Sequence, residues 1–229
     1  PTITREGEAL GSYYGYVADG YFQSQEEIDM ADCVYGGNKA NIKPGYIRYV
    51  DVNHDGEINS KDRVILGNST PRYEYSFTLG GQWKGIDLSL FFQGVGKRDL
   101  YYSGAGARPL VQNSTIFKSQ LDTWSPENPD AEYPLLLVDA GSTNMNNIVS
   151  SFWIKSGAYL RLKNLTVGYT LPKKWTNRVS IDNLRLYFTA SNLFTINNGY
   201  KGYDPETGVT SGAMYPVMKT FNFGINLDF

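Results

Sequence analysis

The sequence predicts an all-β fold whose strands belong to a transmembrane β-barrel, and three observations support this prediction. Several segments alternate apolar and polar residues with a period of two over about ten residues each. Long and short connections between these segments follow one another in turn. Aromatic residues make up 14% of the chain, with 18 Tyr and 11 Phe, and aromatic side chains suit pleated surfaces.

Segment length favours a membrane barrel over a soluble sheet. Strands of soluble proteins are commonly about 5–6 residues long, whereas a tilted membrane strand needs about 9–11 residues. The expected strands are Tyr73–Trp83, Ile86–Gly96, 159–171, 184–194 and 220–229, with a weaker one, rich in Tyr and Gly, over 11–22. We therefore expect about six antiparallel strands of barrel type.

The last expected strand, 220–229, gives the clearest signal. One side of it carries Phe221, Phe223, Ile225, Leu227 and Phe229. The other side carries Asn222, Gly224, Asn226 and Asp228. Barrel strands place apolar residues outward and polar residues inward, with aromatic residues at the headgroups. An apolar strand that ends on a C-terminal Phe is typical of the assembly signal of an outer-membrane barrel.

The connections predict the orientation. Only residues 84–85 separate the first two expected strands, and 171–184 holds a modest turn, whereas 23–72, 97–158 and 195–219 are long. In outer-membrane barrels the short turns are periplasmic and the long loops extracellular. The order predicts an outer-membrane protein of a Gram-negative bacterium, with extracellular long loops and a periplasmic C-terminus.

The composition argues against several classes of function and of binding site. A net charge of −2 and a pI near 5.5 give no footprint for nucleic acid. One cysteine, Cys33, and one histidine, His54, make an internal disulfide impossible and a zinc site implausible. No nucleophile–base pattern is present, so we expect no enzyme and no catalytic residue. The chain contains no run of 18 apolar residues, so no transmembrane helix is expected.

The chain starts at Pro1 without a basic and apolar leader. An outer-membrane protein must be exported, so a signal peptide is expected upstream. The sequence is therefore expected to be the C-terminal piece of a longer protein. Within its long loops, residues 24–31 carry a capping box, with Ser24 and Glu27, that predicts a short helix, and 114–124 could form another.

One segment predicts a metal site. Residues 51–62 read D-V-N-H-D-G-E-I-N-S-K-D, the spacing of a calcium-binding EF-hand or dockerin loop. The expected ligands are Asp51, Asn53, Asp55, Glu57 (through its carbonyl), Asn59 and Asp62. Gly56 permits the sharp turn, and Ile58 should anchor the loop. A solvated Asx-rich turn is the alternative. A calcium ion here would be structural, and no organic cofactor is expected.

With these residues in view, the chain resembles a SusC/RagA-type TonB-dependent outer-membrane transporter over nearly its whole length. The stretches that support the resemblance are G-Y-V-A-D-G-Y-F-Q-S from Gly15, Y-I-R-Y-V-D-V-N-H-D-G from Tyr46, R-V-I-L-G-N-S-T-P-R-Y from Arg63, F-F-Q-G-V-G from Phe91, D-T-W-S-P-E-N-P from Asp122, G-A-Y-L-R-L-K-N-L-T-V-G-Y-T-L-P from Gly157, A-S-N-L-F-T from Ala190, Y-D-P-E from Tyr203 and the terminal strand.

The resemblance implies that residues 1–229 are the C-terminal part of a 22-stranded barrel, without the plug domain, the TonB box and the N-terminal strands. It implies import of an oligosaccharide or a peptide across the outer membrane. A SusD-like surface lipoprotein would cover the barrel, TonB would supply energy through the missing N-terminal part, and outer-membrane lipid would surround the wall.

Two other functions remain open at this point. A secreted, calcium-stabilised β-domain that binds carbohydrate would fold in water without detergent. A small complete barrel acting as an adhesin would have to close with the strands present. Loop aromatics could stack on a sugar, but loop packing or contact with the lid explains them better, so the substrate-binding residues are unknown. These aromatics are Tyr101, Tyr102, Trp124 and Tyr200.

Overall fold

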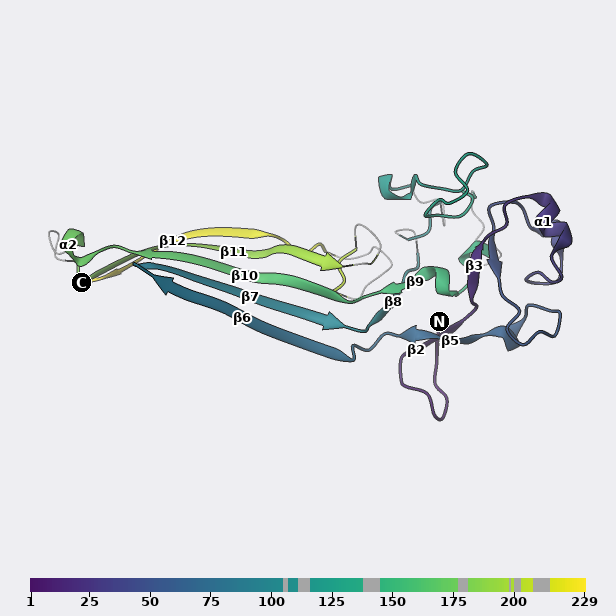
Figure 1. Cartoon of the computed structure of the whole chain (residues 1–229), viewed down its shortest axis with the longest axis horizontal. Coiled ribbons are helices and arrows are strands. Elements are labelled where there is room, and N and C mark those ends of the chain that lie inside the picture. Colours follow the sequence, from purple (N-terminus) through teal and green to yellow (C-terminus); the bar gives the residue numbers. More distant parts are fainter. Residues whose placement is uncertain are drawn as a thin grey trace.

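The computed structural model is dominated by one sheet of five long antiparallel strands, with a body of loops at one end (Figure 1). It describes residues 1–104, 107–110, 116–137, 145–176, 181–197, 199, 203–207 and 215–229. The sheet order is β12-β11-β10-β7-β6. Its strands are β6 (Tyr73–Trp83), β7 (Ile86–Gly96), β10 (Tyr159–Thr170), β11 (Asn183–Asn197) and β12 (Thr220–Asp228). The predicted all-β class is confirmed.

The pairing register follows from the hairpin between β6 and β7. Lys84 and Gly85 both adopt positive φ, 49° and 86°, the conformation of a two-residue turn that matches the twist of antiparallel strands. Pairing then runs without a shift from Trp83 opposite Ile86 to Tyr73 opposite Gly96. Farther across the sheet, β10 contains a bulge between Leu162 and Asn164. The two-residue hairpin predicted at 84–85 is therefore confirmed.

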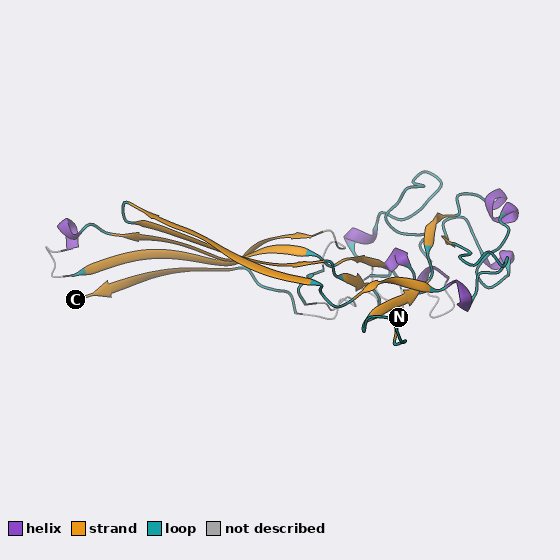
Figure 2. Cartoon of the chain, turned by 60° about the horizontal axis from the view of Figure 1, so that its bottom comes forward, coloured by secondary structure: helices purple, strands orange, loops and turns teal. Residues whose placement is uncertain are grey.

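The body of loops, here called the loop body, is built from residues 1–72 and from described parts of 97–158 (Figure 2). Its short strands are β1 (Thr2–Ile3), β2 (Ser12–Gly15), β3 (Ala18–Tyr21), β4 (Ile47–Tyr49), β5 (Val64–Asn68), β8 (Asp99–Tyr101) and β9 (Ile154–Ser156). Its described helices are α1 (Gln25–Met30) and the 3₁₀ turns Lys39–Asn41, Ser60–Asp62, Lys118–Gln120, Met145–Asn147 and Ser151–Trp153, while α2 (Lys173–Thr176) lies at the far end of the sheet.

The expected weak strand over 11–22 is wrong as a barrel strand. It divides into β2, which pairs with β1 and β5, and β3, which pairs with β4. Glycines interrupt it: Gly20 adopts φ +73°, and a Cβ at Gly15 would lie 2.4 Å from the carbonyl oxygen of Val149. Its tyrosines contribute to a loop core instead of facing lipid.

The two loop helices had different outcomes. Ser24 caps α1, accepting a hydrogen bond from the Glu27 amide at 3.2 Å, and the Glu27 carboxylate accepts one from the Gln23 amide at 2.6 Å. The predicted helix over 24–31 is confirmed. In the 114–124 segment only the single turn Lys118–Gln120 forms, and residues 114–115 lie outside the described part of the chain.

Buried aromatic clusters hold the loop body together. The largest joins residues far apart in the chain: Tyr16, Tyr21, Ile47, Tyr49, Ile58, Trp124 and Ala131. A second cluster holds Leu100, Tyr102, Ala107, Tyr133 and Trp153, and a third holds Phe22, Ile28, Val34 and Ile42. The long loops therefore form a folded body instead of separate excursions. None of the helices in the described segments has the length and apolar character needed to cross a membrane.

Candidate functional site

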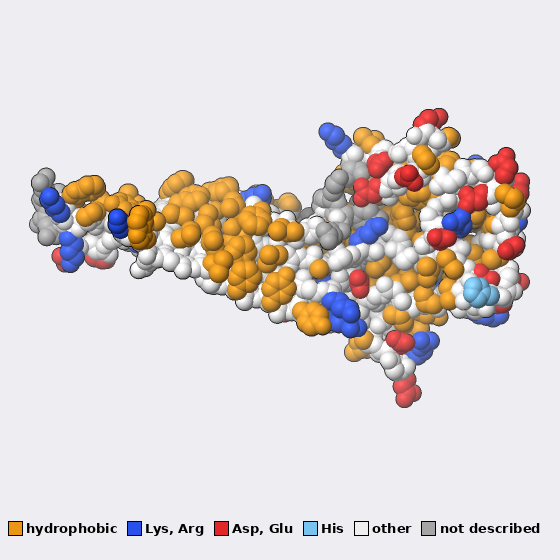
Figure 3. Space-filling view, viewed as in Figure 1, with side chains coloured by type: hydrophobic (Ala, Val, Ile, Leu, Met, Phe, Trp, Pro, Cys, Tyr) orange, Lys and Arg blue, Asp and Glu red, His pale blue; other side chains and the backbone are white. Residues whose placement is uncertain are grey.

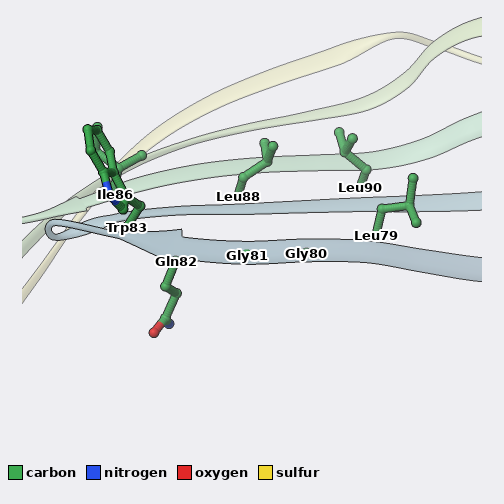
Figure 4. Close-up of a pocket in the computed structure, with 8 residues that line it drawn as sticks. All are labelled: Leu79, Gly80, Gly81, Gln82, Trp83, Ile86, Leu88 and Leu90. Carbon is green, nitrogen blue, oxygen red and sulfur yellow. The ribbon is translucent and has the colours of Figure 1, made fainter.

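The sheet carries an apolar and a polar face. Figure 4 shows the hairpin end, where Leu79, Trp83, Ile86, Leu88 and Leu90 point to one side and Gln82 to the other. The apolar side chains are exposed over a large area, which Figure 3 shows along the sheet. The most exposed of them on the described strands are Tyr73, Trp83, Phe223, Ile225 and, just beyond β12, Phe229. Exposed apolar surface of this extent marks contact with lipid or another apolar partner.

Cross-strand aromatic pairs strengthen the apolar face. Phe77 stacks on Phe92 with ring centroids 4.9 Å apart, and Phe188 lies 4.9 Å from Phe223. Both pairs are directly opposite in the register. Such pairs contribute about 0.2–1 kcal/mol each relative to Ala pairs. These contacts join β6 to β7 and β11 to β12 on the apolar face.

The polar face carries an ion pair that crosses three strands. Arg185 on β11 donates from Nε and Nη2 to both carboxylate oxygens of Asp87 on β7, at 2.9 and 2.6 Å. The pair passes over Gly168 of β10, where a Cβ would lie 2.3 Å from Asp87 Oδ1. Beside it, the Tyr187 ring covers Gly224 of β12 in the same way. Glycine is needed at both positions to let these side chains lie flat across the sheet.

The predicted calcium loop folds as a tight turn in which backbone amides of the loop donate hydrogen bonds to its carboxylates. Asp62 is fully buried and accepts from the amides of Val52 at 3.0 Å and Asn59 at 2.7 Å. Asp51 accepts from the amides of His54 at 2.7 Å and Gly56 at 2.9 Å. These bonds draw both acids toward the inside of the loop.

The other predicted ligands stay near the loop surface. Asp55 accepts from the Asn53 side-chain amide at 3.1 Å and from Lys61 Nζ at 3.2 Å, and Asn59 Oδ1 accepts from the Lys61 amide at 3.0 Å. Glu57 is exposed. Within the described residues, no group of three or more His, Cys, Asp and Glu side chains is arranged to hold a metal ion.

Electrostatics keep Asp51 and Asp55 of this loop charged. The Lys61 ammonium group holds the pKa of Asp55 below its usual value. Partial burial alone would raise the pKa of Asp51, but hydrogen bonds from the Gly56 and His54 amides leave it lowered. Both carboxylates are therefore ionised at neutral pH.

The loop is tied into the loop body. Ile58 is buried in the largest aromatic cluster, as its position in the motif predicted. Gly56 adopts φ +84°, the turn conformation predicted for it. Directly after the motif, Arg63 donates from Nε to the Tyr16 hydroxyl at 3.2 Å. The geometry of this turn is thus set by packing as well as by its own hydrogen bonds.

A second charged cluster was not predicted. Arg161 on β10 is 2% exposed and donates to Glu206 at 2.5 Å, to Asp204 at 2.7 Å and to Thr195 at 2.7 Å. Lys163 adds a 2.5 Å contact to Glu206. We call residues 203–207 with Arg161 and Lys163 the loop clamp. Both halves lie in stretches that support the family resemblance, Y-L-R-L-K-N and Y-D-P-E, but spacing alone does not connect them.

The loop aromatics considered for stacking are largely unavailable. Tyr102 is 1% exposed and Trp124 is 5% exposed, so both pack inside the loop body. Tyr101 is partly buried and tilts against Tyr13 at 6.1 Å. Tyr200 lies outside the described residues.

Comparisons with known proteins agree with this geometry. The TonB-dependent receptor P3 of Formosa agariphila is 33% identical over 246 residues, covering 99% of this chain and 23% of the receptor. The TonB-dependent receptor SusC of Bacteroides thetaiotaomicron is 28% identical, covering 94% of this chain and 20% of SusC. This chain thus spans about a quarter or less of the length of these relatives. No protein-family model matches it.

Two solved structures share the fold. They are the RagAB peptide importer in its open-open state and the RagAB peptide transporter, each with a TM-score of 0.64 at 23% identity over 95% of this chain. The chain covers 22% and 23% of those chains.

A wall of long antiparallel strands with one apolar and one polar face, joined at one end to a folded body of loops, is typical of a segment of a transmembrane β-barrel. Over nearly its whole length this chain is homologous to TonB-dependent receptors, SusC among them, and it corresponds to a part of such a receptor. These relatives are named as receptors, which agrees with the expectation that this chain is not an enzyme.

Proposed function

We propose that this chain forms part of the barrel wall and the extracellular loops of an outer-membrane importer that takes up an oligosaccharide or a peptide. The observation that carries the proposal is the two-faced sheet. Its strands β6 and β7 each have 11 residues, enough to cross the apolar part of a bilayer when tilted. The apolar face would contact outer-membrane lipid, and the polar face would line the lumen.

The partners follow from the same proposal. A SusD-like lipoprotein would sit over the loop body, which exposes Phe117 and Leu121. TonB would act through a part of the protein N-terminal to this chain, where a plug domain and the first barrel strands are expected. The names TonB-dependent receptor, SusC and RagAB among the similar proteins support these assignments.

The orientation is proposed from the arrangement of the connections. The loop body lies at one end of the sheet, and the short turns and the C-terminus lie at the other (Figure 1). Barrels of this membrane have long extracellular loops and short periplasmic turns. The loop body would thus face the medium, and Phe229 the periplasm.

The test is deletion of the gene in its native host, followed by growth and uptake of labelled oligosaccharides and labelled peptides. The expected result is loss of uptake of one of the two classes, with recovery when the full-length gene is restored. The full-length protein should fractionate with the outer membrane. Recovery of the protein only as a soluble, monodisperse species in the medium would favour a secreted carbohydrate-binding domain and contradict the proposal.

We also propose that residues 51–62 bind a structural calcium ion. The donor set fits, since Asp51, Asp55 and Asp62 supply carboxylates while Asn53, Asn59 and the Glu57 carbonyl supply neutral oxygens. These are the hard oxygen ligands that calcium prefers. Bound calcium would replace the Lys61 ammonium group beside Asp55 and stiffen the turn.

Calcium titration of the full-length protein in detergent tests this site. Extracellular calcium sites have a Kd of about 10⁻⁴–10⁻³ M, and calcium at ten times Kd would stabilise the fold by about 1.4 kcal/mol. Asp55→Asn should abolish the resulting rise in Tm, and Asp130→Asn, an exposed acid elsewhere in the loops, should not. A calorimetric titration that shows no heat of binding at a calcium concentration of about ten times the weakest expected Kd would contradict the proposal.

A further inference from the structure

Three lysines and two tryptophans gather at the end of the sheet away from the loop body. We call them the basic rim: Trp83, Lys84, Lys173, Lys174 and Trp175. They come from two turns that lie side by side, because β7 and β10 are paired neighbours. The Thr170 amide donates to the Gly85 carbonyl at 2.7 Å, which joins the two turns. All five residues are exposed, and Figure 3 shows basic side chains at this end.

The basic rim carries three lysine charges and no acidic residue of its own. Lys84 Nζ lies 4.7 Å from the centroid of the Trp83 ring, which keeps the ammonium group beside an aromatic face. Two of the acids at this end of the sheet have other partners: Asp87 is held by Arg185, and Asp228 accepts from Asn183 Nδ2 at 3.0 Å. In the part of the chain that the structure describes, none of the three rim lysines forms an ion pair.

The position of the basic rim relative to the apolar face indicates its ligand. Trp83 pairs with Ile86, which pairs in turn with Tyr169, so its ring ends the apolar face (Figure 4). Tryptophan at such a border lies at headgroup depth in membrane proteins. Lysine side chains there extend their ammonium groups to the polar side. Lysine ammonium groups at this depth therefore lie beside the phosphate groups of the lipid headgroups.

We propose that the basic rim binds the phosphate of anionic phospholipid headgroups. The inference rests on the proposed function, since it takes the apolar face to lie in a bilayer. With the loop body outside, the lipid belongs to the periplasmic leaflet. Each lysine near an anionic membrane surface adds to the attraction, and salt weakens it. The rim would thus fix the height of this wall in the membrane.

The experiment compares lipid binding by the delipidated full-length protein in neutral detergent, read by native mass spectrometry. Phosphatidylglycerol is titrated against phosphatidylcholine, which has the same phosphate but no net charge. We expect phosphatidylglycerol to bind at least about tenfold more tightly. The K84Q/K173Q/K174Q variant should lose this preference, and so should the native protein in high salt.

A matched variant and a competitor control for other sources of binding. K43Q/K97Q/K118Q removes three exposed lysines from the loop body and should keep the preference. Equal binding of both lipids by the native protein, or an equal loss in both triple variants, would overturn the inference. Displacement of phosphatidylglycerol by millimolar inorganic phosphate would identify a site for the free anion instead of a lipid.

The lipid measurement is independent of the proposed import. If uptake is not lost on deletion but the rim variant loses its lipid preference, the proposed substrate class fails and the rim stands. If uptake is lost as expected but the native protein shows no lipid preference, the rim fails and the transporter stands.

Discussion

At the scale of single residues, glycines decide where side chains can cross the sheet. Gly168 lies beneath the ion pair between Asp87 and Arg185, and a methyl group there would meet a carboxylate and a guanidinium within 2.6 Å. Gly81, on β6, makes a matched control, because a methyl group added there would have nothing within 4 Å of it. Comparing alanine at the two positions separates the backbone effect of replacing glycine from the clash that a methyl group causes at Gly168.

Gly168→Ala should therefore destabilise the barrel while Gly81→Ala should not. A methyl group at Gly168 displaces the partly exposed Asp87–Arg185 ion pair, which contributes up to about 1 kcal/mol, whereas an open surface position changes stability by less than about 0.5 kcal/mol. The midpoint of heat-induced unfolding of the full-length protein on a gel measures both. A midpoint for Gly168→Ala equal to that of the native protein would contradict this account of the ion pair.

Tyr133 gives a prediction for alkaline pH. Burial, reinforced by the neighbouring Glu132 carboxylate, raises the pKa of its phenol to about 12. The folded state thus keeps the proton that the unfolded state loses near pH 10, so stability falls as pH rises from 10 to 12. Titration at 295 nm should show a late phenol phase, and Tyr133→Phe should reduce its amplitude and flatten the fall in stability. If the late phase were unchanged in Tyr133→Phe, the phase would belong to other tyrosines and the prediction would be wrong.

At the scale of elements, the loop clamp fixes the last loop to the wall. Besides the ion pairs of Arg161, Arg98 donates to the Pro205 carbonyl at 3.1 Å, and Tyr203 packs edge-on against Tyr102 at 4.9 Å. The bulge in β10 after Leu162 places Lys163 beside Glu206 as well. Hydrogen bonds, ion pairs and a ring contact thus join two separate stretches of the chain.

Arg161→Gln should release the loop clamp. Removing Arg161 leaves Asp204 without its cation, while Glu206 keeps Lys163, and an unsatisfied charged group of this kind costs about 1–3 kcal/mol. Cleavage after Glu206 by a glutamate-specific protease should become at least tenfold faster in the full-length protein. Arg5→Gln, which breaks the exposed pair with Glu8, is the control and should leave this cleavage rate unchanged. Equal rates for native protein and Arg161→Gln would show that other contacts hold the loop.

The elements also show what the sequence could predict. The long strands were predictable because period-two alternation follows directly from a wall with two different faces. The segment 11–22 was expected as a strand because it is rich in Tyr and Gly, but its tyrosines pack into a loop core whose members include residues about a hundred positions away, such as Trp124. The loop clamp was missed for the same reason, since Arg161 and Glu206 are joined by folding and not by spacing. The calcium loop was visible because all its ligands are local, and its metal remains a prediction.

At the scale of the whole molecule, assigning the apolar face to lipid and the polar face to the lumen can be tested with two neighbouring residues. Leu90 and Ser89 are neighbours on β7 and point to opposite sides of the sheet. Leu90 lies between Leu79 and Leu165, and Ser89 between Gly80 and Thr166. If the apolar face meets lipid, a charge at Leu90 lies in hydrocarbon, whereas a charge at Ser89 lies in the lumen.

Leu90→Arg should therefore block assembly, and Ser89→Arg should be tolerated. An arginine on the lipid face near the bilayer midplane costs about 2–4 kcal/mol, comparable to much of the stability of a typical domain. The amount of heat-modifiable, folded receptor in isolated outer membranes measures the difference, with at least a tenfold loss expected for Leu90→Arg alone. The opposite order would reverse the two faces. Equal accumulation of both variants would mean that neither face meets lipid, and the secreted alternative would then account for the fold better than a membrane wall.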